Sequence, residues 1–213
     1  MSTRSGRNPA KLSKFEKTGR VRFPFPCNIM LRDVPMDVIL LNREDMARTL
    51  ERLAYQVLEK YASLDDVLLV GIQPRGVDLA RRPGAILEGR AGHNIPLGTL
   101  DINRYRDDWT SLSAIPALGE WPTPVPVEKK HIILVDDVLF TGRTIRAALE
   151  AIADFGRPRK VELLALIDRG HRELPIHPDY TGKKIPTRRA ERVDVLVNEL
   201  DGRDEVVLRK GDA

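Results

Sequence analysis

The sequence has one cysteine and no long apolar run, and both shortages exclude classes of protein. Cys27 cannot form a disulfide within the chain or supply a thiolate-rich metal site, so we expect a reducing compartment. Apolar runs such as Val38–Leu41 and Val67–Val70 fall far short of the roughly 20 residues that cross a bilayer. The basic N-terminus is not followed by an apolar core, which argues against a secretory signal. We therefore predict a soluble, cytoplasmic protein that does not associate with membranes.

The length and the distribution of charge predict one domain with a basic extension. The 213 residues are enough for one α/β domain of about 180 residues that buries a full core. Residues 1–22 hold seven basic residues and one acidic residue, whereas the rest of the chain holds 28 basic and 30 acidic residues. Because a basic stretch with few apolar residues cannot bury enough surface to fold, we predict a disordered extension over residues 1–33 and one domain over residues 34–213. The extension could contact RNA, or it could serve only to keep the protein soluble.

The apolar pattern predicts helices that alternate with short strands. Asn42–Tyr61 has helical periodicity, and Asn42 with Asp45 three residues later is the pattern of an N-terminal cap. A further helix is predicted over Gly142–Phe155. Apolar runs that are too short for helices, and typical of strands buried on both faces, occupy residues 67–72, 97–102, 131–135, 161–167 and 193–200. The alternation predicts an α/β fold in which helices flank a parallel twisted sheet.

Two long segments do not fit this alternation. Tyr105–Val127 contains two tryptophans and four prolines, which predicts an extended loop or an irregular hairpin. Loops of this length in compact domains are usually functional or disordered. Asp168–Pro186 combines charged residues with several turn formers and is placed outside the predicted sheet.

The strongest functional pattern is HIILVDDVLFTGRT at residues 131–144. An apolar strand ends there in two adjacent carboxylates, Asp136 and Asp137, which can accept hydrogen bonds from ribose hydroxyls or from Mg²⁺-bound water. Thr141–Thr144 then open a helix, where backbone amides, hydroxyl groups and the helix dipole converge on an anion. The spacing predicts a ribose beside its own 5′-phosphate. The alternative is that the carboxylates only end the strand and that Thr141 only caps the helix.

Gly71–Gly76, GIQPRG, has the glycine spacing of a nucleotide-binding loop but not its chemistry. Val77 and Asp78 follow where such a loop requires Lys and then Ser or Thr, so nucleoside triphosphate binding is not predicted. A tight turn after a strand, with Arg75 and the exposed amides around Gly76, could still hold a pyrophosphate. On its own the pattern is equally compatible with an ordinary turn between a strand and a helix.

These motifs resemble a known family. VDDVLFTGRT is similar to the 5-phosphoribosyl-1-pyrophosphate (PRPP) motif of type I phosphoribosyltransferases, and LDINRYRDDW with DRGHRELPIHPDYTGKKIPT resembles the PyrR family in particular. The resemblance runs from about Val34 to Val206. It implies the type I phosphoribosyltransferase fold with a flexible active-site loop, and an enzyme that converts uracil and PRPP to UMP and pyrophosphate with Mg²⁺. In many bacteria such proteins also regulate pyrimidine operons by binding messenger RNA.

The resemblance also implies roles for individual residues. Asp136 and Asp137 would contact the ribose and organise Mg²⁺, mostly through the ribose or through water. Arg104 and Arg106, at the root of the long loop, would close over the leaving pyrophosphate and stabilise it, the alternative being that they lie on a solvated loop. The residues implied to bind PRPP or UMP are Arg75, Gly76, Asp136, Asp137, Val138, Leu139, Phe140, Thr141, Gly142, Arg143 and Thr144.

The base pocket implied by the resemblance includes Phe140, Arg169, Gly170 and His171. Purine-salvage relatives carry an acidic residue at the position of Phe140, where it handles a proton of the base, and an aromatic side chain cannot do so. A purine substrate is therefore disfavoured, and we expect uracil to be recognised largely by backbone groups. His171 is either part of this pocket or a structural hydrogen-bonding residue.

Several positions depart from the family pattern. Glu51 and Tyr55 replace a Thr and a His on the helix face that contacts RNA, and an added carboxylate repels phosphate, which argues against binding of a messenger RNA leader. Pro83 and Gly84 are expected to interrupt a helix that is continuous in relatives. Two alternatives to the enzyme therefore stay open: a UMP-responsive RNA-binding regulator with vestigial catalysis, and a regulator that acts on a protein partner. We also expect a homo-oligomer, a dimer or larger.

Overall fold

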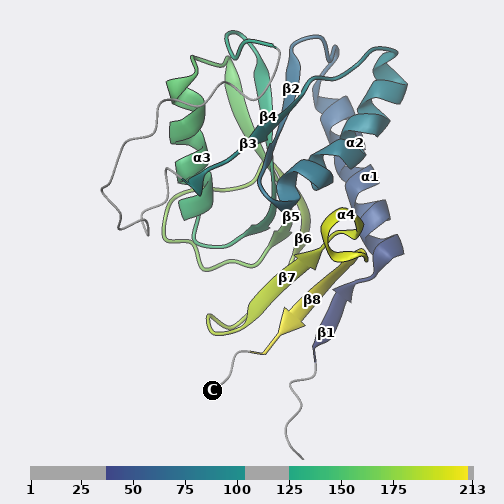
Figure 1. Cartoon of the computed structure of the whole chain (residues 1–213), viewed down its shortest axis with the longest axis vertical. Coiled ribbons are helices and arrows are strands. Elements are labelled where there is room, and N and C mark those ends of the chain that lie inside the picture. Colours follow the sequence, from purple (N-terminus) through teal and green to yellow (C-terminus); the bar gives the residue numbers. More distant parts are fainter. Residues whose placement is uncertain (1–36, 104–124, 211–213) are drawn as a thin grey trace, which may run out of the picture. The chain divides into compact units, whose positions relative to one another are not determined.

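The computed structural model describes residues 37–103 and 125–210. The predicted N-terminal extension and most of the predicted loop lie outside these ranges, as do Arg104 and Arg106. No helix in the described ranges is long and apolar enough to cross a membrane. The elements, shown in Figure 1, are in chain order β1 (Val38–Leu41), α1 (Arg43–Lys60), β2 (Val67–Ile72), α2 (Arg75–Ala91), β3 (Leu97–Leu100), β4 (His131–Leu139), α3 (Arg143–Asp154), β5 (Lys160–Asp168), β6 (Tyr180–Lys184), β7 (Arg192–Leu196), α4 (Asn198–Asp201) and β8 (Glu205–Arg209).

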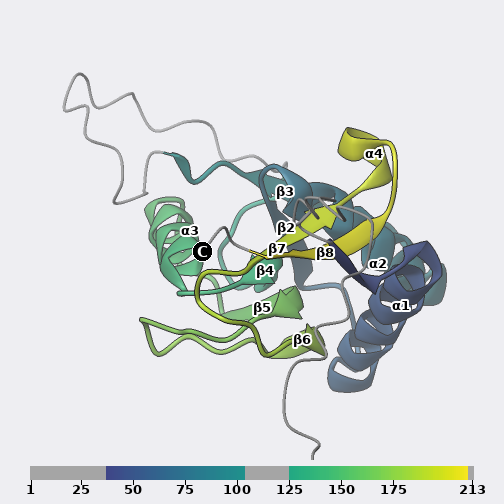
Figure 2. The same cartoon turned by 90° about the horizontal axis from the view of Figure 1, so that it is seen from below.

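Five strands form a parallel sheet in the order β3-β2-β4-β5-β6, as the sequence predicts. β2, β4 and β5 are nearly continuous apolar runs because both of their faces are covered. Leu69 and Ile133 pack with α1 and α2, whereas the alternate residues Leu68 and Ile132 pack with α3. Figure 2 shows α3 on one side of the sheet and α1 with α2 on the other.

β1, β8 and β7 form a second sheet, which is antiparallel. The prediction of one strand of the main sheet at residues 193–200 is wrong, because β7 ends at Leu196 in the second sheet and α4 follows it. The pattern there has a period of two: Val193 and Val195 are buried, while Asp194 between them faces the other side, as in a half-buried antiparallel strand. β6 likewise forms inside the segment that the sequence pattern places outside the sheet.

The cap predicted for α1 is confirmed, and the interruption predicted in α2 is wrong. Asn42 Oδ1 accepts from the Asp45 amide at 2.8 Å, and Asp45 Oδ2 accepts from the Asn42 amide at 3.4 Å. α2 continues through Pro83. Pro83 and Gly84 are buried, and a Cβ at Gly84 would stand 3.1 Å from Leu69 Cδ1. Close packing on β2 therefore outweighs the low helix propensity of both residues.

A buried carboxylate joins the end of α1 to the starts of β5 and β6. Glu162 has no exposed side-chain surface and accepts from the hydroxyls of Tyr61 and Tyr180, each at 2.8 Å. It also pairs with Lys60 at 2.5 Å and with Lys160. Burial alone would raise the pKa of Glu162, but the hydrogen bonds from both lysines and both tyrosines outweigh it and lower the pKa to about 2. The ionised carboxylate therefore stabilises the folded chain at neutral pH.

We expect Glu162→Gln to lower the free energy of unfolding at pH 7 by about 1–3 kcal/mol, because buried donors lose a charged acceptor. Folding lowers the pKa from 4.5 to about 2, so this contribution is present above pH 4.5 and is lost as the pH falls toward 2. Urea denaturation over this pH range measures the difference from the native protein, with Glu59→Gln at an exposed position of α1 as the control. A difference that stays constant down to the acid limit would contradict this account.

Candidate active site

Two adjacent carboxylates lie near the end of the central strand of the parallel sheet. β4 pairs with β2 on one side and with β5 on the other, so its carboxyl end lies in the middle of the sheet edge. Asp136 lies opposite Ala165 in the ladder and is 5% exposed, and Asp137 accepts from the Val138 amide at 2.7 Å. Burial raises the pKa of both carboxyls, and the charge of Asp137 raises the pKa of Asp136 further. Hydroxyl donors or a cation would stabilise such a pair.

The turn after these carboxylates leads into α3. Gly142 precedes the helix with a φ of 94°, a left-handed conformation that favours glycine. Gly142 has no side chain to cap the helix, but the Thr141 hydroxyl accepts from the Arg143 amide at 3.3 Å, and the first turn holds no acidic residue. The carbonyl of Thr141 accepts from the amides of Glu173 and Leu174 at 2.9 and 3.2 Å, which fixes the turn. The amides at the start of α3, with the helix dipole behind them, form a site for an anion such as a phosphate.

Glu173 also holds the arginine of this turn, a role that the sequence analysis missed. Arg143 Nε donates to Glu173 at 2.9 Å, and Arg189 pairs with the same carboxylate. The hydrogen bonds from Arg143 and Arg189 lower the pKa of Glu173. Glu173 thus fixes the turn through its amide and orients Arg143 through its side chain. Its place inside the DRGHRELPI stretch is the sequence signal that could have identified it.

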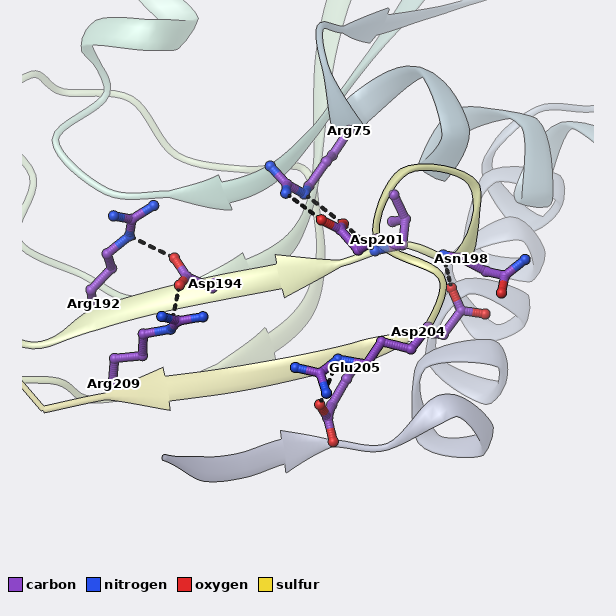
Figure 3. Close-up of polar contacts among 10 residues, drawn as sticks. Arg75, Arg192, Asp194, Asn198, Asp201, Asp204, Glu205 and Arg209 are labelled. Atoms are coloured by element: carbon purple, nitrogen blue, oxygen red, sulfur yellow. Dashed lines mark hydrogen bonds and ion pairs between the residues drawn. The ribbon is translucent and has the colours of Figure 1, made fainter. Parts of the chain in front are cut away.

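Arg75 opens α2 and forms a two-pronged ion pair with Asp201 of α4. Its Nε and Nη2 donate to the two carboxylate oxygens at 3.2 and 2.9 Å (Figure 3). This ion pair raises the pKa of Arg75 and lowers the pKa of Asp201. Gly76 lets the turn approach β4, since a Cβ there would stand 2.4 Å from the Val135 carbonyl oxygen. The guanidinium is thereby held in the same pocket as Asp137.

This pocket has a volume of about 440 Å³ and lies between the two sheets. It is lined by Arg75, Asp137, Val138, residues 192–196, Asp201 and Arg209. The structure therefore brings Arg75 and Asp137 together as the sequence predicts, and Thr141–Thr144 follow at the same end of β4. Two acidic residues of the pocket, Asp194 and Asp201, lie outside any recognisable motif, so the sequence analysis did not predict them.

Comparisons with known proteins show the family of this chain. Residues 39–198 match the model of the phosphoribosyl transferase domain. The chain is 49% identical over 174 residues to the bifunctional protein PyrR of Chloroflexus aurantiacus, an alignment that covers 82% of this chain and 96% of that protein. It is 51% identical over 167 residues to the protein of the same name from Ligilactobacillus salivarius, with 78% and 94% covered. The chain belongs to the PyrR family of phosphoribosyltransferases.

Solved structures of other phosphoribosyltransferases share the fold of this PyrR family member. A hypoxanthine phosphoribosyltransferase from Staphylococcus aureus matches with a TM-score of 0.58 at 20% identity, covering 82% of this chain and 92% of that one. The hypoxanthine phosphoribosyltransferase of Trypanosoma cruzi in complex with the product IMP gives 0.61 at 15% identity, covering 83% and 91%. At these identities the likeness concerns the fold alone, and it confirms the predicted type I phosphoribosyltransferase fold.

Arg169 and His171 pack against Phe140 and form hydrogen bonds to the segment that precedes β7. The Arg169 guanidinium lies over the Phe140 ring, with Cζ 4.1 Å from the ring centroid, and His171 meets the ring edge-on at 5.9 Å. The Arg169 guanidinium donates to the backbone carbonyls of Arg188 and Glu191, which precede β7. His171 Nε2 lies 2.6 Å from the Thr187 carbonyl oxygen of the same segment. These contacts fix Arg169 and His171 beside the Phe140 ring. A direct role of residues 169–171 in base recognition stays a prediction.

The carboxylate pair fits a magnesium ion that arrives with the substrate. Mg²⁺ usually keeps several waters and is held through one or two carboxylates together with substrate phosphates. Asp136 and Asp137 supply such carboxylates, and burial raises the pKa of each, so a nearby positive charge would stabilise their ionised forms. Among the described residues, no group of three or more His, Cys, Asp or Glu side chains gathers as a metal site. The ion would therefore contact this protein mainly through ribose hydroxyls or water.

We expect Asp136→Asn to reduce turnover and PRPP affinity by about ten- to hundred-fold, because a neutral amide loses charge-assisted hydrogen bonds to the ribose. Folding raises the pKa of Asp136 above its ordinary 3.8, so ionisation destabilises the native protein increasingly as the pH rises above that value. The variant should therefore unfold at a higher temperature than the native protein at pH 7 and at a similar temperature below pH 4. Thermal unfolding at both pH values measures this, with the exposed Asp65→Asn as the control. Native turnover in the variant would refute the site.

Proposed function

We propose that this PyrR family member is a uracil phosphoribosyltransferase, which converts uracil and PRPP to UMP and pyrophosphate. The observation that carries the proposal is the carboxyl end of β4, where Asp136 and Asp137 precede the turn that opens α3 and where Asp137 shares a pocket with the guanidinium of Arg75. These features correspond to the parts of PRPP. The carboxylates suit the ribose hydroxyls, the start of α3 suits the 5′-phosphate, and Arg75 suits the pyrophosphate.

Each group of residues would then act on one part of the substrate. The ribose hydroxyls donate to Asp136 and Asp137, while the amides of Thr141–Thr144 donate to the 5′-phosphate. Arg75, oriented by Asp201, donates to the pyrophosphate. When bound, Mg²⁺ would supply further positive charge to the leaving group. The bond from ribose C1 to pyrophosphate breaks as C1 bonds to N1 of uracil, pyrophosphate departs with the electron pair, and the N1 proton of uracil passes to water.

We also propose that Arg104 and Arg106 act on the leaving pyrophosphate. They follow β3 in the chain, and β3 runs parallel to β2 and therefore to β4, so its carboxyl end lies at the same edge of the sheet as the carboxylates. Positive charge at that edge would stabilise the oxygens on which negative charge develops as the bond to C1 breaks.

The surroundings of Phe140 support a pyrimidine acceptor over a purine. The ring is covered by the Arg169 guanidinium on its face and by His171 at its edge. A phenyl ring can neither take nor give a proton, so a purine that relies on an acidic partner at this position would lack it. Uracil is smaller and neutral, and an apolar wall at this place suits one side of its ring.

The acceptor preference tests this proposal. With PRPP and Mg²⁺, uracil should release pyrophosphate about tenfold faster or more than hypoxanthine or guanine, and orotate is measured beside them as a second pyrimidine. All four acceptors are measured on one preparation, and Asp137→Asn controls for contaminating activity. Faster turnover of a purine than of uracil would overturn the choice of base. Absence of release with all four acceptors would overturn the enzymatic function.

Regulation through RNA is the second candidate function, because the curated relatives are named bifunctional. The face of α1 nonetheless carries Glu51 and Tyr55 at exposed positions. Arg90 of α2 donates to the Tyr55 hydroxyl at 3.1 Å and lies over its ring, so this guanidinium already has a partner. We therefore propose that the affinity for RNA comes mainly from the basic residues 1–22.

Deletion of residues 1–22 tests the source of RNA affinity. We expect the truncated protein to lose essentially all binding in a gel-shift assay, because basic residues in such a stretch neutralise phosphates without reading bases. The loss should be the same for a pyrimidine-operon leader and for a scrambled RNA, and phosphoribosyl transfer should be unchanged. A truncated protein that still prefers the leader would show that the folded domain recognises RNA.

A further inference from the structure

The hairpin of β7 and β8 presents three charged side chains on one face. Arg192 and Arg209 lie directly opposite each other across the two strands, and Asp194 lies two residues further along β7. Because side chains alternate along a strand, all three share a face, and all three line the pocket that contains Asp137. Figure 3 shows them side by side on the hairpin. We name them the Arg–Asp–Arg group.

Asp194 orders the two arginines of this group. Like charges placed directly opposite each other destabilise a strand pair, and a carboxylate between them offsets the repulsion. Arg192 Nε donates to one carboxylate oxygen at 2.6 Å, and Arg209 Nε lies 2.7 Å from the other. The side chain of Asp194 is 15% exposed, against 77% for Arg192 and 49% for Arg209. The carboxylate is therefore recessed, with one guanidinium on either side.

The Arg–Asp–Arg group lies on the side of the pocket where the proposed function puts the acceptor base. This inference rests on that function, which puts the ribose on Asp137 and the pyrophosphate at Arg75. A nucleophile enters C1 on the side opposite the leaving group, so the base lies on the side of the pocket away from Arg75. β7 supplies that side, since Arg192 begins the strand, whereas Asp201, the partner of Arg75, follows its other end. Asp194 and Asp137 line the same pocket.

We propose that the Arg–Asp–Arg group recognises the imide edge of a pyrimidine-2,4-dione acceptor. That edge presents a carbonyl oxygen, the N3–H group and a second carbonyl oxygen, in the order acceptor, donor, acceptor. The hairpin presents the complementary order of guanidinium donor, carboxylate acceptor and guanidinium donor. Because the contacts to Asp194 use the Nε atoms, the terminal amino groups of both arginines can donate to the two carbonyls. Each carboxylate oxygen also keeps a second lone pair for N3–H.

The same arrangement disfavours other bases. Cytosine presents an unprotonated N3 to the carboxylate and an amino group to a guanidinium, and both contacts are repulsive. Guanine places a second donor opposite a guanidinium, and hypoxanthine leaves one guanidinium without an acceptor. Uracil, thymine and orotate share the full imide edge, so the group selects this class of base.

Binding of UMP and of 3-methyl-UMP, in which a methyl group replaces the N3 hydrogen, tests the proposal without requiring turnover. In isothermal titration calorimetry the native protein should bind UMP about tenfold tighter or more. Asp194→Ala should weaken UMP binding by about ten- to hundred-fold and abolish the preference, because it removes the acceptor for N3–H. PRPP carries no base, so its affinity should not fall in this variant, which also shows that the variant is folded.

Glu205→Gln is the matched control. Glu205 of β8 pairs with Arg203 at 3.5 Å on the same hairpin but does not line the pocket, so the variant should bind both nucleotides as the native protein does. Equal affinities of the native protein for the two nucleotides, or an undiminished preference in Asp194→Ala, would overturn the proposal. A native protein that prefers UMP but releases no pyrophosphate with uracil would instead overturn the proposed catalysis and leave imide recognition in place.

Discussion

The rest of the site depends on the burial of two adjacent carboxylates near the end of a central strand. β4 has a neighbour on each side, so Asp136 and Asp137 are delivered to the sheet edge with no freedom to move away from each other. Burial raises the pKa of both, which means that their ionised forms cost folding free energy. The guanidinium of Arg75, oriented by Asp201, lies in the pocket of Asp137, and the first turn of α3 holds no acidic side chain.

Both apolar and ionic contacts hold the second sheet at the carboxyl end of the parallel sheet. Val193 and Val206 belong to the same core as the buried faces of α1 and α2, and their burial supplies the stabilising free energy. Arg75 and Arg82 lie seven residues apart on one face of α2, and they bind Asp201 and Asp204 on either side of the turn before β8. Because guanidinium–carboxylate pairs are directional, these contacts determine how the hairpin is oriented toward the pocket.

Much of the parallel sheet could be predicted because each of its signals is contained in a short stretch. The apolar run at residues 67–72 is β2, and the helices predicted over Asn42–Tyr61 and Gly142–Phe155 are α1 and α3 with one residue fewer at each end. β1, β6 and β8 have only four or five residues each, and their buried and exposed residues do not alternate regularly. Their sequence pattern therefore does not distinguish them from loops. The second sheet was missed for this reason.

The sequence by itself determined the chemistry of the site, since the carboxylates and the phosphate turn fall within residues 136–144, where spacing along the chain dictates spacing in the fold. Only the tertiary structure decided which side chains complete it. Asp201 pairs with Arg75 from 126 residues away, and Glu173 reaches Arg143 from 30 residues away. Asp194 lines the same pocket as Asp137 because the antiparallel hairpin of β7 and β8 lies against the carboxyl end of the parallel sheet. Such partners follow from strand order and packing between distant elements, which local periodicity and residue propensity do not contain.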